Sequence, residues 1–150
     1  MDEAMRSKIL DILDHHRVMT IATLRADGWP QATTVGYVNE GLSLYFLCGL
    51  DSQKAANLAR DDRVSLTIDH DTPQVMEISG LSMAAHAQAV LDPAEGEKAL
   101  RLMMEKYPLQ NSLPLPMPKF ADVRVFRVTP KVISLLDYSR GFGHTDLLTC

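Results

Sequence analysis

The sequence predicts a mainly β protein, an antiparallel sheet or small barrel with helices packed outside it. Segments rich in β-branched residues follow one another closely, with Gly, Asn, Asp and Pro turns between them. Only two or three helices are indicated, and they do not alternate regularly with the strands, which argues against a parallel sheet. At 150 residues the chain is expected to form a single domain, 1–150, with a substantial core.

The N-terminal segment, residues 2–15, is predicted to be an amphipathic helix. Its apolar residues Met5, Ile9, Ile12 and Leu13 recur at helical spacing. One face of this helix is therefore expected to pack on the core.

Three antiparallel strands in a meander are predicted next. Segments 17–24 and 31–38 are rich in β-branched residues and flank Asp27-Gly28, which is typical of a hairpin. A second turn at residues 39–41 leads into an apolar strand over 42–48. If the second and third strands pair across that turn, the first half of the second strand lies beside the end of the third.

A short helix, a strand and a long strand are predicted in the middle of the chain. The helix follows Ser52 and ends near residue 60, and a strand over 63–70 comes after it. The long strand covers 75–90, with Gly80 marking a bulge or bend.

The last third of the chain is predicted to hold one helix and two strands. Proline at position 93 precedes a helix over 94–107. The four prolines of 108–119 exclude regular structure there. Strands are expected over 122–129 and 132–138, separated by Pro130.

Composition and motifs exclude several classes of function. The net charge is −4 with a pI near 5.7, so a small anion is a better partner than nucleic acid. Two cysteines without paired Cys/His spacing suggest neither a disulfide framework nor a metal site. No apolar run is long enough to span a membrane, and we expect a cytoplasmic protein. Dinucleotide-fold, P-loop and serine-hydrolase motifs are also missing from the sequence.

A lysine stands where helix electrostatics disfavour one. Ser52 is the predicted N-cap, which makes Gln53 the first helical residue and Lys54 the second. A cation there opposes the helix dipole by a few tenths of a kcal/mol, roughly, but a bound phosphate would reverse the sign. The alternative is that Lys54 simply extends into water.

Two hydroxyls and a glycine in the second strand complete the candidate site. Thr33 and Thr34 are adjacent, so one of them faces the interior whichever register holds. Pairing of the second and third strands would bring them near Cys48, Ser52 and Lys54. Gly36 could let a flat group approach the backbone, or could mark a bend for barrel closure.

The succession WPQATTVGYV, LSLYFLCGLDSQKAANL and RVSLTID, followed by a long strand, resembles the pyridoxamine 5'-phosphate oxidase-like family of FMN-binding split barrels. The resemblance covers residues 15–90 and extends through the final strands. Its strongest element is the pattern Ser-x-Lys-x-x-x-Leu formed by Ser52, Lys54 and Leu58.

The resemblance implies a six- to seven-stranded antiparallel split β-barrel and a homodimer with two FMN molecules between its subunits. The phosphate would lie near Ser52 and Lys54, and the ring along the second strand. The positions that would contact the cofactor are Thr33, Thr34, Val35, Leu47, Cys48, Ser52, Gln53, Lys54 and Val75.

The sequence also departs from the family pattern. The oxidases have arginines where Thr33 and Gln53 stand, so two phosphate cations are missing, and hydroxyls replace only part of that pairing. The C-terminal Trp and Arg-His motifs of the oxidases are missing too, which argues against pyridoxamine phosphate as substrate. The tail is expected to fold over the flavin of its own or the partner subunit, with Arg140 or His144 near the ring. It could equally form a dimer arm or a frayed end.

The sequence thus favours an FMN-dependent oxidoreductase that acts on a small organic molecule, with no side-chain nucleophile required. Alternatives are a split barrel that holds deazaflavin or haem, a non-catalytic flavin-binding or stress-response dimer, and a structural dimer.

Overall fold

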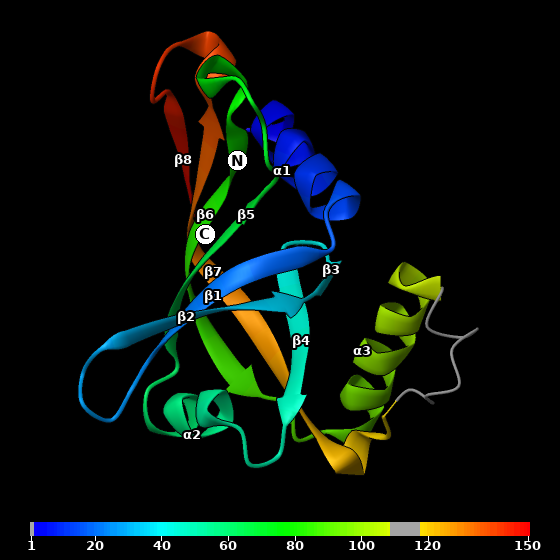
Figure 1. Ribbon diagram of the computed structural model, residues 1–150. Coiled ribbons are helices and arrows are strands. Elements are labelled where there is room, and N and C mark those ends of the chain that lie inside the picture. Colours follow the sequence, from blue (N-terminus) through cyan, green and yellow to red (C-terminus); the bar gives the residue numbers. More distant parts are fainter. Residues whose placement is uncertain (1, 109–117) are drawn as a thin grey trace.

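The computed structural model describes residues 2–108 and 118–150, and an eight-stranded antiparallel sheet forms its centre (Figure 1). The sheet curls into a half-open barrel with the order β2-β1-β5-β6-β7-β4-β3, and β8 pairs with β7. The predicted fold class is confirmed. The strands are β1 (Val18–Leu24), β2 (Pro30–Gly36), β3 (Val38–Glu40), β4 (Ser43–Gly49), β5 (Arg63–Asp69), β6 (Ser79–Ala89), β7 (Val123–Asp137) and β8 (Thr145–Thr149).

Three α-helices pack around the sheet: α1 (Glu3–His15), α2 (Gln53–Arg60) and α3 (Pro93–Lys106). All three were predicted within two residues of these bounds. The carboxylate of Asp2 caps α1 by accepting from the N–H of Ala4 at 2.9 Å. The helix α2 lies across one end of the barrel, and α3 lies beside β4 (Figure 1). No helix within 2–108 and 118–150 combines the length and the apolar character needed to cross a membrane.

The main core fills the barrel. Alternate residues of β5 point inward and are buried, as the period-two pattern requires. Ile9 and Leu13 of α1 enter the same core, and both are fully buried. The rings of Phe46 and Phe126 stack inside the barrel with their centroids 5.3 Å apart. The inward stripe of α1 and the inward faces of the strands therefore form one continuous core.

The predicted meander of three strands is wrong at its second step. The chain leaves β2 at Gly36, and only the short β3 pairs with β4. Tyr37 lies between β2 and β3, where its side chain is fully buried and its hydroxyl donates to the carbonyl of Leu13 at 2.8 Å. This inward turn ends β2 early. The facing edges of β2 and the second half of β4 therefore have no strand partner within the described residues.

The long sixth strand starts later than predicted. Residues Val75–Glu77 form the 3₁₀ turn η1, and β6 begins at Ser79. Gly80 pairs regularly with Asp69 and Leu136, so it is not a bulge. Glycine is needed at this position because β6 approaches β5 closely: a Cβ atom at Gly80 would lie 2.5 Å from the carbonyl oxygen of Ile68.

Pro130 does not separate two strands, as the sequence suggested, because β7 runs through it without a break. The irregularity between β6 and β7 lies here: Ala84 pairs with Val132 and Ala85 with Pro130, which leaves Lys131 unpaired with β6. A bulge is one of the few places in a sheet that tolerates proline. Most of the predicted irregular segment 108–119 lies outside the described residues.

The C-terminal tail is ordered into a strand that the sequence did not predict. After the 3₁₀ turn η4 (Tyr138–Arg140), β8 pairs along β7 and buries Leu148. The carboxylate of Asp146 accepts from Arg140 at 3.3 Å and contacts His144 at 3.2 Å. The tail is therefore ordered along β7 and is not frayed.

Candidate functional site

The N-terminus of α2 is built as the sequence predicted. The hydroxyl of Ser52 accepts from the N–H of Ala55 at 3.1 Å, which confirms the N-cap. The N–H groups of Gln53 and Lys54 belong to the first turn, where a helix offers no carbonyl partner. Two backbone donors and the positive end of the helix dipole therefore point away from the helix at this place.

Lys54 does not simply extend into water. It lies three and four residues before Asn57 and Leu58, which are buried, so all three share the helix face that packs on the barrel. Burial lowers the pKa of Lys54, and the neighbouring Cys48 partly opposes this shift. Within the described part of the chain, no hydrogen bond or ion pair to Lys54 is present. The result is a half-buried ammonium without a counter-ion.

Thr33 carries a second polar group without a partner. Its Oγ1 is buried and makes no hydrogen bond within the described residues. Val35 follows on the same face of β2 and packs against the main core, whereas Thr34 points to the exposed outer face. A buried hydroxyl without a partner is costly, so this position favours a group that the hydroxyl can bond.

Leu47, Cys48 and Gln53, which the sequence placed at the cofactor, face in different directions. Cys48 packs against the main core, while Leu47 packs against the separate cluster beneath α3. The amide of Gln53 donates to the side chain of Asn57 at 2.8 Å. The structure therefore places Cys48 with Lys54, turns Leu47 to the other side of β4 and ties Gln53 to its own helix.

Val75, Arg140 and His144 lie at the other end of the molecule. The turns η1 and η4 pack together there, and the N–H of Tyr138 donates to the carbonyl of Ile78 at 2.9 Å (Figure 1). The length of β6, eleven residues or roughly 30 Å, separates this end from the α2 end. Within one subunit these three residues are therefore not brought together with Lys54.

Sequence reasoning missed two features near the site. The buried side chain of Asn57 donates to Thr23 Oγ1 at 3.0 Å and so fixes α2 on β1. The space over Gly36 is filled by Tyr107, whose hydroxyl would lie 2.9 Å from a Cβ at this glycine and bonds the carbonyl of Arg17. The flat group that lies over Gly36 is therefore the ring of Tyr107, the C-cap residue of α3. No local pattern in the sequence marks either contact.

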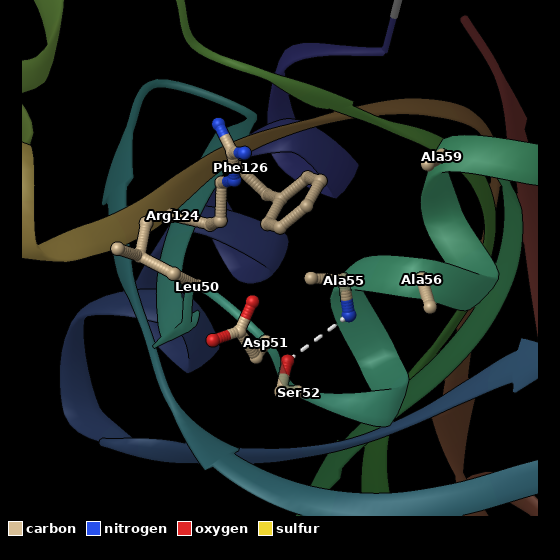
Figure 2. Close-up of a pocket in the computed structure, with 8 residues that line it drawn as sticks. All are labelled: Leu50, Asp51, Ser52, Ala55, Ala56, Ala59, Arg124 and Phe126. Carbon is tan, nitrogen blue, oxygen red and sulfur yellow. Dashed lines mark hydrogen bonds between the residues drawn. The ribbon is translucent and has the colours of Figure 1, made fainter.

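A pocket of about 530 Å³ opens on another face of α2, between this helix and β7. Ser52, Ala55, Ala56 and Ala59 line it from the helix side (Figure 2). Lys54 is not among the residues that line the pocket. Ser52 at the N-terminus of α2 thus borders this pocket, whereas Lys54 lies outside it.

The unpartnered groups at the N-terminus of α2 suit a phosphate group. An ammonium without a counter-ion and two free backbone N–H groups can each donate to phosphate oxygens. The hydroxyl of Thr33 can also donate to an acceptor. The ammonium then gains the partner whose absence makes its burial unfavourable.

Comparisons with known proteins agree with this architecture. The sequence profile of the pyridoxamine 5'-phosphate oxidase family matches residues 5–137. General stress protein 26 of Bacillus subtilis (strain 168) is 28% identical over 67 residues, which are 45% of this chain. The matched region spans about half of that relative, 47% of its length.

Solved structures with low sequence identity share the fold. A haem-binding protein from Mycobacterium smegmatis superposes with a TM-score of 0.78 at 19% identity, covering 99% of this chain and 59% of that one. HutZ, the haem storage protein from Vibrio cholerae, has a TM-score of 0.66 at 19% identity, covering 95% and 92%. The family profile, unlike these structures, matches the sequence itself over most of its length. The chain therefore belongs to the pyridoxamine 5'-phosphate oxidase family.

Proposed function

We propose that the protein binds FMN and acts as a flavin-dependent oxidoreductase on a small organic molecule. The observation that carries this proposal is Lys54, a half-buried ammonium without a counter-ion beside free N–H groups at a helix N-terminus. A phosphate group satisfies all of these donors together. Bound FMN would supply the electron or hydride transfer, and the protein would supply placement and electrostatics.

The free edge of β2 supports a place for the flavin ring. Because β2 pairs only with β1 in the described residues, its other edge presents backbone N–H and C=O groups. Such groups can bond the polar edge of a planar ring, and Thr33 adds a hydroxyl. This chain's part in the reaction is then to hold the ring and to exclude water from one side of it.

The proposal includes a homodimer with the cofactor between subunits and a cytoplasmic location. Arg140 and His144 lie at the far end of their own barrel, so only the tail of a partner subunit could bring these groups to the ring. Both are already held by Asp146, which would present them as a preformed unit. The substrate would be a small molecule, with neither nucleic acid nor membrane involved.

The visible spectrum of the purified protein, before and after dithionite, tests the proposed function. We expect a yellow protein with flavin bands that dithionite bleaches. A Soret band would assign haem instead, which the names of two structural neighbours make a relevant outcome. A deazaflavin spectrum would also overturn FMN, as would a colourless protein that binds no added FMN.

Turnover separates an enzyme from a flavin-binding protein without catalysis. With FMN bound, an oxidoreductase should consume NADH or NADPH repeatedly in the presence of an acceptor. A single stoichiometric reduction without turnover in any donor and acceptor pair would contradict the enzymatic part of the proposal and leave flavin binding intact.

A further inference from the structure

The pocket on the β7 side of α2 has walls made mainly of small and apolar groups. Three alanines of α2, Ala55, Ala56 and Ala59, recur at helical spacing and form one wall. The ring of Phe126 and the side chain of Leu50 form the opposite wall (Figure 2). These surfaces suit a compact apolar group, and about 530 Å³ is ample for a small molecule.

Two opposite charges line the same pocket without neutralising each other. Figure 2 shows the guanidinium of Arg124 beside the Phe126 ring, and the carboxylate of Asp51 on another side of the pocket near Ser52. Neither side chain forms a hydrogen bond or an ion pair within residues 2–108 and 118–150. Both charges are therefore available to a ligand.

Three arginines elsewhere in the described chain form ion pairs with carboxylates. Arg63 pairs with Asp61 at 2.6 Å, and Arg127 pairs with Glu95 at the same distance. Arg25 pairs with Asp27 within its own hairpin, at 3.2 Å. Arg124, in register with Cys48, instead lines the pocket and forms no ion pair within the described residues, although the Asp51 carboxylate lines the same pocket.

The charge pattern selects the chemical class of the ligand. A phosphate or another multiply charged anion would meet the Asp51 carboxylate, and a simple cation would meet Arg124, so each carries a repulsive contact. A zwitterion satisfies both side chains at once. Its carboxylate can take two parallel hydrogen bonds from the guanidinium, and its ammonium can donate to Asp51.

We infer that this pocket binds a small zwitterion with an apolar side chain, of the α-amino-acid class, between Arg124 and Asp51. The apolar side chain lies against the alanine face of α2 and the Phe126 ring. The pocket shares Ser52 with the proposed phosphate site, but Lys54, which carries the flavin proposal, does not line it. The two proposals can therefore be tested separately.

Alanine-methyl NMR of the full chain tests the inference directly, because Ala55, Ala56 and Ala59 report from the wall of the pocket. Four probes are titrated: L-phenylalanine, L-leucine, 3-phenylpropionate, which lacks the ammonium, and phenethylamine, which lacks the carboxylate. We expect saturable shifts of these methyl signals with both amino acids. Each analogue that lacks one charge should bind at least about tenfold more weakly, the equivalent of ~1.4 kcal/mol.

Variants that remove one charge each test whether Arg124 and Asp51 hold the two charged groups of the ligand. Arg124→Gln and Asp51→Asn should each weaken L-phenylalanine about tenfold or more, and Asp51→Asn should abolish the preference for L-phenylalanine over 3-phenylpropionate. The matched controls Arg101→Gln and Glu105→Gln, at exposed positions of α3, should bind as the parent does. The inference is overturned if neither amino acid gives saturable shifts. It is also overturned if Arg124→Gln binds unchanged, or if 3-phenylpropionate binds the parent as tightly as L-phenylalanine.

Discussion

Lys54→Ala should weaken FMN binding by roughly 10- to 100-fold, because a charge-assisted hydrogen bond contributes about 1.5–3 kcal/mol. The variant removes a cation that has no ion pair within the described residues and leaves the Ser52 cap in place. Fluorescence titration of FMN into parent and variant measures the difference. Lys131→Ala is the matched control, because this exposed lysine lies in β7, outside the proposed site, and should leave affinity unchanged.

The same site should give FMN binding a characteristic pH dependence. Burial lowers the pKa of Lys54 in the free protein, so its ammonium loses its proton at a lower pH than an exposed lysine does. Affinity should therefore fall as the pH rises into the alkaline range, and Lys54→Ala should lack this slope. Equal affinity of parent and Lys54→Ala at neutral pH would contradict the assigned role of this residue.

Gly80→Ala should destabilise the fold by about 1–3 kcal/mol, the usual cost of inserting a group into well-packed structure. The new Cβ would lie 2.5 Å from the carbonyl oxygen of Ile68, a backbone atom that the β5–β6 ladder holds in place. Chemical denaturation of parent and variant gives the free energies of unfolding.

Gly49→Ala is the matched control for this substitution. Gly49 also lies in a strand, but apart from its chain neighbours no described atom lies within 4 Å of a Cβ built there, and its φ is not positive. Its free energy of unfolding should stay within about 0.5 kcal/mol of the parent. If Gly80→Ala were as stable as Gly49→Ala, the close approach of β6 to β5 would not be what requires glycine at this position.

Local signals in the sequence were sufficient to predict the helix α2 at the candidate site. The serine cap, the register of α2 and the position of Lys54 all follow from a few adjacent residues, and the structure confirms the cap and the helix. Whether Lys54 is solvated depends on which helix face meets the barrel. That face is fixed by the contact of Asn57 with Thr23, 34 residues away in the chain.

Long-range pairing was harder to predict. The turn after residue 38 correctly indicated a hairpin, but the burial of Tyr37 against α1 redirects β2 before it can pair with β4. Pro130 was expected to end a strand because proline lacks an N–H donor. Only the partner strand, which meets it at a bulge, shows why β7 continues.

The candidate site was predicted in part. Cys48 packs against the main core, and Ser52 and Lys54 begin the helix that packs on the barrel, while the contacts that the family resemblance implies for these residues and Thr33 remain predictions. Val75, Arg140 and His144 were also expected at the cofactor, yet they lie at the other end of the chain's barrel, separated from α2 by the length of β6. Their part in the site remains a prediction that requires the partner subunit. The pocket with Arg124 and Asp51 combines distant segments and leaves no local pattern.

Native mass spectrometry after reconstitution with FMN tests the central claim most directly, since it measures subunits and cofactor in one experiment. We predict a dimer that carries two FMN molecules, and a Lys54→Ala dimer that loses them under the same conditions. A protein that stays free of FMN in the presence of excess cofactor would contradict the claim.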